Sequence, residues 1–566
     1  MFVRLQRYCG DGCALFILLY VIASVFVTWA VALPLFDPAY RGLLPYLSAD
    51  HLYYALHVQE ALLGGDVSNG IFSLGNVSGV QPVGLEIVAG WLFGWTHLTG
   101  GDVVRIVTLV VFPLWLPLGY IVLRKTGSSR IVAMVAAAGF FWLNILAVHR
   151  YVHQSWSFPC FLIGLWLLVR WWQSPRFSTA VAAGAWTGMM TQVYFWNWTF
   201  LATVLGCLTL CTVLPRCTRG TNGSVYRRTL PVLWGAFFLL ALPYIVQTLG
   251  NLQSPFFAET ARRSALLLTR EIESWPRSIV TVVLAVSGIV TAYRYADQKH
   301  LGPLLALASA PALVLNQQLI HGRVISFSTH FVPFISFATV VLMAWAWSHR
   351  RTVSWSGWII VAAGLIFNAP LAMERGWSLS FFRTQVSNYS FQHLASAMTV
   401  LRSDGAKDVI LTDKETALHV AAHTDDDVVF VEYIRHLLLP TSEYAERFCL
   451  SELPSDPPVS GEEVPEQLRE LSRVGQTQIS EAFRENAATA RLACCTVRKD
   501  PAASLQHYGV TALLWDEILH PDWRIDSKLF SVRERGDGWS LWRLNDLKTG
   551  DVDARLQSAR SSCMAL

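Results

Sequence analysis

The sequence predicts a polytopic α-helical membrane protein with about eleven spans, followed by a C-terminal soluble α/β domain. Two observations predict this fold class. Of the 566 residues, 53% are hydrophobic and only 15% are charged, whereas soluble globular proteins carry about 25% charged residues. The composition also changes near residue 374, from long apolar runs joined by short basic loops to an ordinary globular sequence rich in Asp and Glu. We therefore expect a transmembrane domain over residues 1–373 and a folded domain over residues 374–566.

Apolar segments of membrane-helix length recur through the first of these two parts. A helix needs about 20 apolar residues to cross a hydrocarbon core of about 30 Å. The stretch 178–214 is too long for one crossing, and we divide it at Phe195, Trp196 and Asn197, where polar and interfacial aromatic residues indicate a turn. The predicted spans are 13–36, 103–123, 129–147, 158–172, 178–194, 198–214, 229–249, 277–294, 301–317, 330–347 and 353–373.

The distribution of Lys and Arg in the short loops predicts the orientation of the chain. Cytoplasmic loops carry an excess of these residues. Arg4 and Arg7 place the N-terminus in the cytoplasm, and an odd number of spans then places the C-terminal domain on the extracytoplasmic side. Every second later connection is basic, with Arg124, Lys125 and Arg130; Arg170 and Arg176; Arg216, Arg219, Arg227 and Arg228; Arg294 and Lys299; and Arg350 and Arg351.

Residues 82–99 form one further apolar segment. Counting this segment as a full span would move Arg124 and Lys125 to the outer side and invert every later loop. We therefore expect residues 82–99 to be re-entrant or to lie at the membrane interface.

The loop 37–102 is the longest connection of the membrane part, and loops of this length in compact domains are usually functional. Within it, the sequence predicts an amphipathic helix that begins near Ser48, a plausible N-cap. Asp50, Tyr54 and His57 follow an i, i+4, i+7 spacing and share one face of that helix. This spacing leaves two interpretations of Asp50 open: a carboxylate that only caps the helix, or a functional group held at the membrane surface.

The order of short motifs in this region resembles that of the GT-C superfamily of membrane glycosyltransferases, which includes protein O-mannosyltransferases and the aminoarabinose transferases of lipid A. Those families have an acidic residue shortly before Tyr in the first outer loop, then a proline-containing helix, then Arg at the start of the second span. The matching residues here are Asp50 with His51 and Tyr53 or Tyr54, Glu60 to Asp66, Gln81 to Leu85, and Arg105. The chain departs from the family pattern in having His51 in place of a second acidic residue, and it has no D-x-D motif.

The resemblance implies an enzyme that moves a sugar from a polyprenyl-phosphate donor to a glycan, lipid or protein acceptor on the extracytoplasmic face. It also implies a multi-pass membrane protein, in the bacterial cytoplasmic membrane or, with the same geometry, in the endoplasmic reticulum. Asp50 is the candidate general base for the acceptor hydroxyl. Arg105 and Arg323 are the candidate ligands of the donor phosphate, because guanidinium groups hold phosphate oxygens bidentately. Alternatively, Arg105 only extends its charge to the membrane boundary.

Further polar residues cluster at the predicted outer ends of the spans. As a set, they predict a cavity for phosphate and sugar; taken singly, each could instead bond a neighbouring helix end. The predicted cavity residues are Tyr54, His57, His149, His153, Gln317, His321 and His330. We expect no metal, because no HExxH, CxxC or acidic pair accompanies the histidines. We also expect no cofactor, and no nucleic-acid partner because the polar loops do not interleave aromatic with basic residues.

The C-terminal domain has its own pattern of short strands and helices. Residues 408–433 predict strand, helix and strand, residues 508–517 predict a further strand, and residues 530–545 predict a hairpin with a Gly-Asp-Gly turn. We expect a helix over 466–490 and a solvated acidic run at residues 425–427. A disulfide is possible among Cys449, Cys494 and Cys495.

Two other classes of function compete with the transferase interpretation. One is a membrane transporter or flippase of lipid-linked or polar substrates, and the other is a non-catalytic envelope assembly protein. Transporters often contain repeated halves and charged residues near the middle of the membrane. The first-loop pattern occurs once in this chain, and the centres of the predicted spans are nearly free of charge. Both features favour chemistry at the membrane surface.

Overall fold

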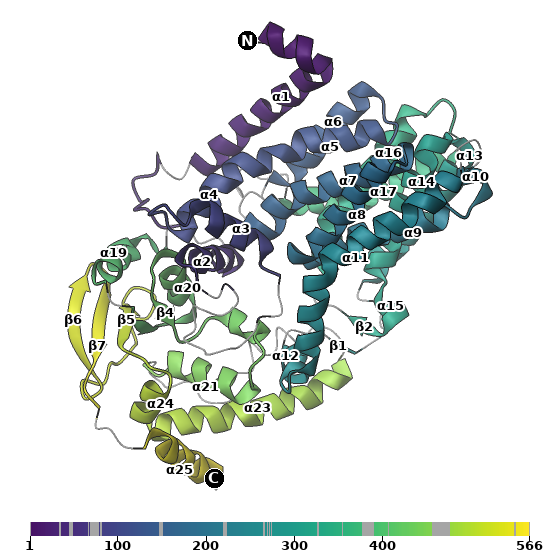
Figure 1. Ribbon diagram of the computed structural model, residues 1–566. Coiled ribbons are helices and arrows are strands. Elements are labelled where there is room, and N and C mark those ends of the chain that lie inside the picture. The colour runs from purple at the N-terminus through teal and green to yellow at the C-terminus, as the bar shows by residue number, and fades with distance from the viewer. Residues whose placement is uncertain are drawn as a thin grey trace. The chain divides into compact units, whose positions relative to one another are not determined.

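The computed structural model describes residues 2–564 apart from 33–35, 45–48, 66, 68–78, 80–81, 146–150, 219–222, 264–266, 269, 271, 273, 325–327, 354, 376–389, 406, 455–475 and 548–550. The chain forms two compact units, each made of separate stretches of sequence (Figure 1). The helical unit comprises Met1–Leu33, Arg105–Gln247 and Arg270–Gln385. The sheet unit comprises Pro34–Val104, Thr248–Thr269 and Val386–Leu566.

Every predicted span overlaps a helix. These helices are α1 (Phe2–Ala32), α4 (Gly100–Val111) continued through a 3-10 turn by α5 (Trp115–Lys125), α6 (Arg130–Leu143), α7 (Ser157–Gln173), α8 (Phe177–Met189), α9 (Phe195–Cys211), α11 (Gly223–Gln253), α13 (Trp275–Tyr295), α14 (Gln298–Leu315), α16 (Val332–Ser348) and α17 (Trp355–Arg375). Shorter elements join them: η5 (Tyr151–Trp156), η6 (Met190–Gln192), α10 (Pro215–Thr218), α15 (Gln318–His321), β2 (Arg323–Val324) and η7 (Ser328–Phe331). The predicted turn at Phe195 lies slightly earlier, because α8 and η6 end by Gln192 and α9 already begins at Phe195.

Among the described residues, three helices are long and apolar enough to cross a membrane: Gly100–Lys125, Ser224–Gln253 and Trp275–Tyr295. Several shorter helices are also apolar, including Arg130–Leu143 and Val332–Ser348. A helix of 17 residues is only about 26 Å long, somewhat less than the hydrocarbon thickness. The structure therefore contains helices suited to a membrane, and the number of spans stays a prediction.

Helices α8 and α11 pack closely because α8 has two glycines four residues apart. A Cβ atom added to Gly184 would lie 2.0 Å from the carbonyl oxygen of Leu233, and one added to Gly188 would lie 2.3 Å from that of Phe237. Such spacing of small residues allows backbones to approach closely in membrane helices. The second contact lies four residues after the first in both helices. Helices α8 and α11 therefore run parallel, as the predicted topology requires.

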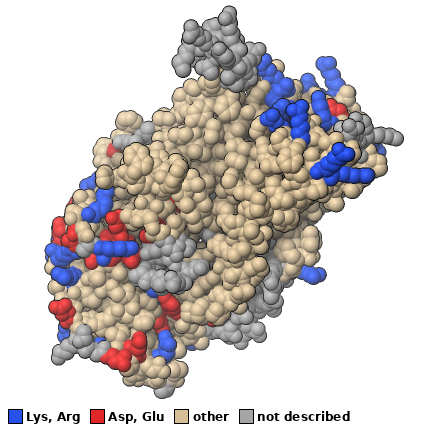
Figure 2. All heavy atoms as spheres, viewed as in Figure 1, with Lys and Arg blue, Asp and Glu red and all other residues tan. Residues whose placement is uncertain are grey.

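The basic connections of the helical unit lie beside one another at one end of it. The side chain of Gln173 donates to Lys125 O over 2.6 Å, and Ser129 N donates to Ser348 Oγ over 2.9 Å. Arg216 donates to Arg294 O over 3.2 Å. Figure 2 shows Lys and Arg gathered over this part of the unit, near α10 and α13. The loops predicted to be cytoplasmic therefore share one end, which we call the basic end.

The sheet unit contains the predicted α/β fold. Its five-stranded sheet has the order β4-β3-β5-β7-β6, in which β3 pairs in parallel with β4 and β5, and β7 runs antiparallel to β5 and β6. This confirms the predicted strand–helix–strand unit and the closing hairpin. The strands are β1 (Leu267–Leu268), which lies outside this sheet, β3 (Val409–Leu411), β4 (Asp427–Val428), β5 (Ala512–Asp516), β6 (Phe530–Gly536) and β7 (Trp539–Leu544). The helices are α2 (Ala49–Leu63), α3 (Gly84–Phe93), α12 (Phe257–Arg263), η8 (Gln392–Leu394), α19 (Ala395–Ser403), α20 (Lys414–His423), η9 (Glu432–His436), α21 (Thr441–Ser451), α23 (Gln476–Lys499), α24 (Pro501–His507) and α25 (Val552–Met564).

The first outer loop packs against the C-terminal part of the chain within the sheet unit. The backbone N–H groups of Arg41 and Leu43 both donate to Gln392 Oε1, and Leu44 N contacts His423 Nε2 at 3.3 Å. Helix α2 contacts both α3 and α20. The sheet unit is therefore assembled from the first loop and the C-terminal sequence together. The predicted domain boundary near residue 374 lies beside the residues that are not described, and it stays a prediction.

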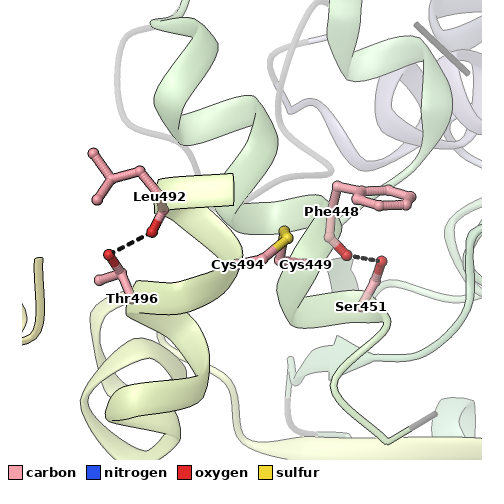
Figure 3. The surroundings of a disulfide bond; sticks show 6 residues. All are labelled: Phe448, Cys449, Ser451, Leu492, Cys494 and Thr496. Carbon is pink, nitrogen blue, oxygen red and sulfur yellow. Dashed lines mark hydrogen bonds between the residues drawn. A yellow bond between two sulfur atoms is a disulfide. The ribbon is translucent and has the colours of Figure 1, made fainter. Parts of the chain in front are cut away.

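Two disulfides join helices of the sheet unit. Cys449 of α21 is bonded to Cys494 of α23 (Figure 3), and Cys495 of α23 is bonded to Cys563 of α25. The adjacent cysteines thus point to different partners and hold α23 between two other helices. Cys563 was not among the cysteines that the sequence singled out. The predicted helix over 466–490 corresponds to α23, whose first residue is Gln476; residues 455–475 lie outside the described chain.

Within the acidic run at residues 425–427, only Asp425 is exposed as the sequence suggested, and the next two residues are buried. Asp426 and Asp427 are 4% and 7% exposed. Asp426 Oδ1 accepts a hydrogen bond from Asp408 N over 2.9 Å, and Asp427 pairs with Lys407 at 2.8 Å. The prediction was wrong for Asp426 and Asp427 because they lead into strand β4, and residues beside the neighbouring strand supply partners that cannot be seen in the local sequence.

Candidate functional site

The helix predicted in the first outer loop is α2, and it begins at Ala49. Asp50 therefore lies in its first turn, where the helix dipole stabilises a negative charge. The side chain of Asp50 and the predicted cap Ser48 lie outside the described residues. The nine side chains from Leu52 to Glu60 are all buried. Helix α2 is thus enclosed within the sheet unit, rather than presenting one apolar face as an amphipathic surface helix would.

Tyr54 and His57 are buried in an aromatic cluster on α2. The ring of Tyr53 lies edge-on to Tyr54, with centroids 5.6 Å apart, and edge-on to His57, at 4.5 Å. Tyr433 of η9 stacks on Tyr53 at 3.9 Å with an interplanar angle of 18°. His57 Nδ1 also bonds to Val67 O. The cluster fixes the face of α2 that was predicted to be functional, and Tyr433 is a member that the sequence pattern did not reveal.

The next turn of α2 is hydrogen-bonded to the first residue of α4. Gly100 N donates to Gln59 Oε1 over 2.7 Å, and Gln59 Nε2 donates to Asp425 Oδ1 over 3.2 Å. Helix α4 contains Arg105, the predicted phosphate ligand, whose side chain is half-buried. Asp102 caps the same helix by accepting hydrogen bonds from Thr99 N and Oγ1.

The second group of predicted residues lies in the helical unit, around the start of α9. Tyr194 Oη and His330 Nδ1 are 2.5 Å apart, and the His330 ring stacks on Trp196 with centroids 4.5 Å apart. Asn197 Nδ2 donates to Ser157 O over 2.8 Å. Three buried atoms of this cluster have no hydrogen-bond partner among the described residues: Gln192 Nε2, Trp196 Nε1 and Asn197 Oδ1. Since buried polar groups are nearly always hydrogen-bonded, this cluster can receive polar groups of a ligand.

This cluster lies at the end of the helical unit away from the basic end. Helix α9 runs from the cluster at Phe195 to Cys211, a rise of about 25 Å, and Arg216 follows shortly after it. Helix α14 starts at Gln298, whose carbonyl accepts a bond from Trp172 Nε1, and runs in the opposite sense to Leu315. The segment that follows α14 contains the polar residues Gln317, His321 and His330.

The remaining predicted residues have fewer described contacts. Gln317 is half-buried and precedes α15, and His321 is exposed at the end of that helix. The backbone of Arg323 belongs to β2 and that of His153 to η5, but both side chains lie outside the described residues, as does all of His149. The described residues therefore bring His330 to Tyr194 and Trp196, and they do not test the other predicted contacts.

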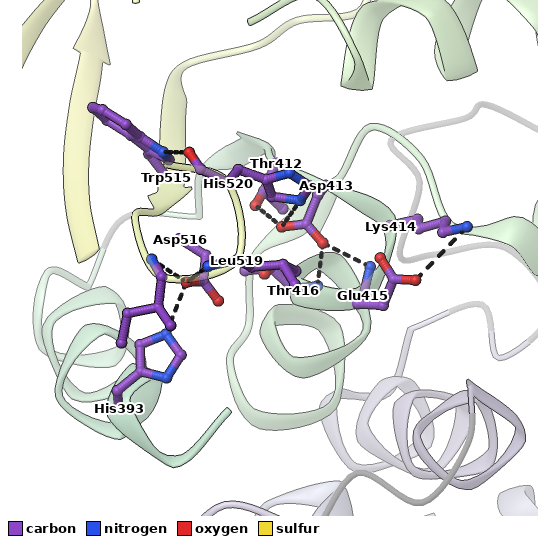
Figure 4. Close-up of polar contacts among 11 residues, drawn as sticks. His393, Thr412, Asp413, Lys414, Glu415, Thr416, Trp515, Asp516, Leu519 and His520 are labelled. Atoms are coloured by element: carbon purple, nitrogen blue, oxygen red, sulfur yellow. Dashed lines mark hydrogen bonds and ion pairs between the residues drawn. The ribbon is translucent and has the colours of Figure 1, made fainter. Parts of the chain in front are cut away.

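A further polar cluster lies at the carboxyl ends of β3 and β5 (Figure 4). Asp413 caps α20 and lies 3.8 Å from His520 Nε2, and Asp516 Oδ1 accepts from His393 Nε2 over 2.9 Å. Burial would raise the pKa of Asp413, but its interactions with His520 and Thr416 outweigh burial and lower that pKa. An acidic residue at or near the carboxyl end of each apolar strand was the sequence signal for this cluster. The contact between Asp413 and His520 joins the segments that follow β3 and β5.

Among the described residues, no group of three His, Cys, Asp or Glu side chains is arranged to hold a metal ion. No protein-family model matches the chain, and no curated protein matches it either. Any function must therefore be argued from the residues themselves.

Proposed function

We propose that this protein is a multi-pass membrane glycosyltransferase of the GT-C type, with about eleven spans. It moves a sugar from a polyprenyl-phosphate donor to an acceptor on the extracytoplasmic face. The observation that carries the proposal is the construction of the first loop. A helix with Asp50 in its first turn is enclosed by the sheet unit and hydrogen-bonded to the start of α4, the helix that contains Arg105. This is the order of features that the resemblance to GT-C enzymes implies.

The proposed orientation is supported by one feature of the helical unit and one of the sheet unit. The basic connections share one end of the helical unit, as expected of cytoplasmic loops. The sheet unit contains two disulfides, and disulfides persist mainly in oxidising compartments outside the cytoplasm. The polar cluster at Tyr194 and His330 lies away from the basic end, on the side where a donor for extracytoplasmic transfer would be used.

The proposed chemistry is a direct displacement at the anomeric carbon of the donor sugar. The acceptor hydroxyl oxygen forms the new bond to this carbon while the bond from the carbon to the phosphate oxygen breaks. Asp50 accepts the hydroxyl proton, a role that contributes roughly 10²–10⁴ to the rate in general-base catalysis. Polyprenyl phosphate leaves with the bonding electrons, and Arg105 and Arg323 stabilise its charge.

The residue assignment is tested with purified protein in lipid and radiolabelled polyprenyl-phosphate sugars. Asp50→Asn is expected to reduce transfer at least 100-fold, because the amide cannot accept the proton. Asp37→Asn, the same change in the same loop but outside α2, is the matched control and should retain activity. Arg105→Ala should mainly raise the KM for the donor, and Arg105→Lys should restore part of the loss because it keeps the charge. Normal turnover by Asp50→Asn and Arg105→Ala would remove this assignment.

Two histidine variants test which end of the helical unit binds the donor. His330 stacks on Trp196 in the polar cluster, and His349 packs against Trp345 at the basic end. His330→Ala is expected to reduce transfer about 10-fold or more. A hydrogen bond to a charged group contributes about 1.5–3 kcal/mol, and the variant would lose such a bond to the ligand. His349→Ala should leave transfer near the wild-type rate. Equal losses in both variants would contradict the placement.

A further inference from the structure

Helix α3 presents an exposed apolar face that no described residue of the sheet unit covers. Its exposed side chains are Ile87, Val88, Trp91, Leu92 and, just beyond the helix, Trp95. They follow the spacing of a single helix face. Trp91 and Trp95 are 81% and 82% exposed, which is unusual for the largest apolar side chain. The one charged residue of the helix, Glu86, is 1% exposed and lies on the opposite face.

The opposite face fixes α3 against α2. Glu86, Ala89 and Gly90 are buried there. A Cβ atom added to Gly90 would lie 2.4 Å from Ala61 O, so the two helix backbones touch at this point. This contact prevents rotation of α3 about its axis, and the apolar face keeps its direction.

The position of α3 relative to a membrane follows from its contact with α2. The segment Gly100–Lys125 is long and apolar enough to cross a membrane. Its first residue, Gly100, bonds to Gln59 and has no room for a Cβ because Ala55 O would lie 2.2 Å away. Ala55 and Ala61 are six residues apart, which is about 9 Å along α2. Helix α3 and the start of the apolar segment therefore lie beside the same short length of α2.

We propose that α3 lies in the membrane interface and buries its apolar face among the lipid acyl chains of the outer leaflet. With 10 residues it is about 15 Å long, half the hydrocarbon thickness, so it cannot cross. Its two exposed tryptophans are the residue type that is enriched at membrane interfaces. The Trp95 indole N–H donates to Leu92 O over 2.8 Å, which lets this ring enter an apolar region. The lipid contact sets the height of α2 above the membrane.

This inference depends on the chain being in a membrane and not on sugar transfer. The test uses the full-length protein in lipid nanodiscs, with a spin label on cysteine introduced by Trp91→Cys or Trp95→Cys. The readout is the ratio of collision rates with oxygen, which concentrates in lipid, and with a water-soluble nickel chelate. Ile518→Cys labels another exposed apolar side chain of the sheet unit, and Val110→Cys labels an exposed side chain inside the candidate span. The signal of the unsubstituted chain is subtracted.

Labels at Trp91 and Trp95 are expected to give oxygen-to-nickel ratios at least several-fold above that at Ile518 and below that at Val110. Ratios equal to that at Ile518 would show that the face is in water and would overturn the proposal. Ratios equal to or above that at Val110 would place α3 deep in the membrane, as a re-entrant segment, and would also overturn it. Because both positions are more than 80% exposed, the substitutions should leave the fold intact.

Discussion

At the scale of single residues, burial changes the behaviour of the acidic side chains around β4. Asp426 is 4% exposed, and its Oδ2 atom has no hydrogen-bond partner among the described residues. Burial raises the pKa of Asp426 to about 6, against the opposing hydrogen bonds from Asp408 and Thr424. The folded protein therefore keeps a proton on this side chain over a pH range in which the unfolded chain has lost it.

Asp426→Asn should remove part of the pH dependence of stability. Because the pKa is raised from 3.8 to about 6 in the folded state, wild-type stability from this group is fully present below pH 3.8 and is lost as the pH rises to about 6. The pKa rises by roughly 2 units, and at about 1.4 kcal/mol per unit the loss is on the order of 3 kcal/mol. The measurement is denaturant unfolding of the full chain in detergent between pH 4 and 7. A difference between wild type and variant that stays constant with pH would contradict this account.

At the scale of elements, the sequence predicted those strands and turns that depend only on neighbouring residues. The strands β3 and β5 are short apolar runs, and the hairpin β6–β7 turns at Gly538, whose φ of +80° favours glycine. The burial of Leu52–Glu60 in α2 was not predictable, because it depends on partners such as Asp425, 366 residues from Gln59. The contact of His330 with Tyr194 was also not predictable, because the two residues are 136 positions apart in the sequence. Polar clusters could be predicted as sets, but their pairings could not.

The contact of α8 with α11 offers a test of helix packing. Gly188→Val should destabilise the helical unit by about 1–3 kcal/mol, because the added side chain would clash with the α11 backbone at Phe237. Gly206→Val is the matched control: Gly206 also lies in a helix, α9, but a Cβ there has open space within 4 Å. Thermal unfolding of the two variants in detergent measures the difference. Equal midpoints would show that α8 and α11 do not pack in this way.

At the scale of the whole molecule, the disulfides test which side of the membrane carries the sheet unit. Trypsin should release Phe448–Arg469, Leu492–Arg498 and Ser561–Leu566. Both Cys494 and Cys495 lie in the middle peptide, so the two disulfides predict one species of three linked peptides. The protein is taken from membranes whose thiols were blocked before lysis, and unreduced peptides are analysed by mass spectrometry. Recovery of three separate alkylated peptides would indicate a reducing compartment and contradict the proposed orientation.

The whole chain combines a helical unit with a basic end and a sheet unit built from the first loop and the C-terminal sequence. This arrangement gives the first loop a rigid support, because α2 is buried among residues from distant parts of the chain. A rigid support matters for displacement chemistry, since small errors in the position of a reacting group reduce the rate strongly. In the proposed function, the sheet unit would thus position the candidate base.

The most direct measurement is a donor comparison with the wild-type protein in lipid vesicles that contain an extracytoplasmic acceptor fraction. Radiolabelled sugar is supplied either on polyprenyl phosphate or on a nucleotide, and both labelled acceptor and released polyprenyl phosphate are measured. The proposed function predicts transfer from the polyprenyl-phosphate donor, with one polyprenyl phosphate released for each sugar transferred, and no transfer from the nucleotide sugar. Movement of the intact lipid-linked sugar between the leaflets without its cleavage would contradict the account and identify a flippase instead.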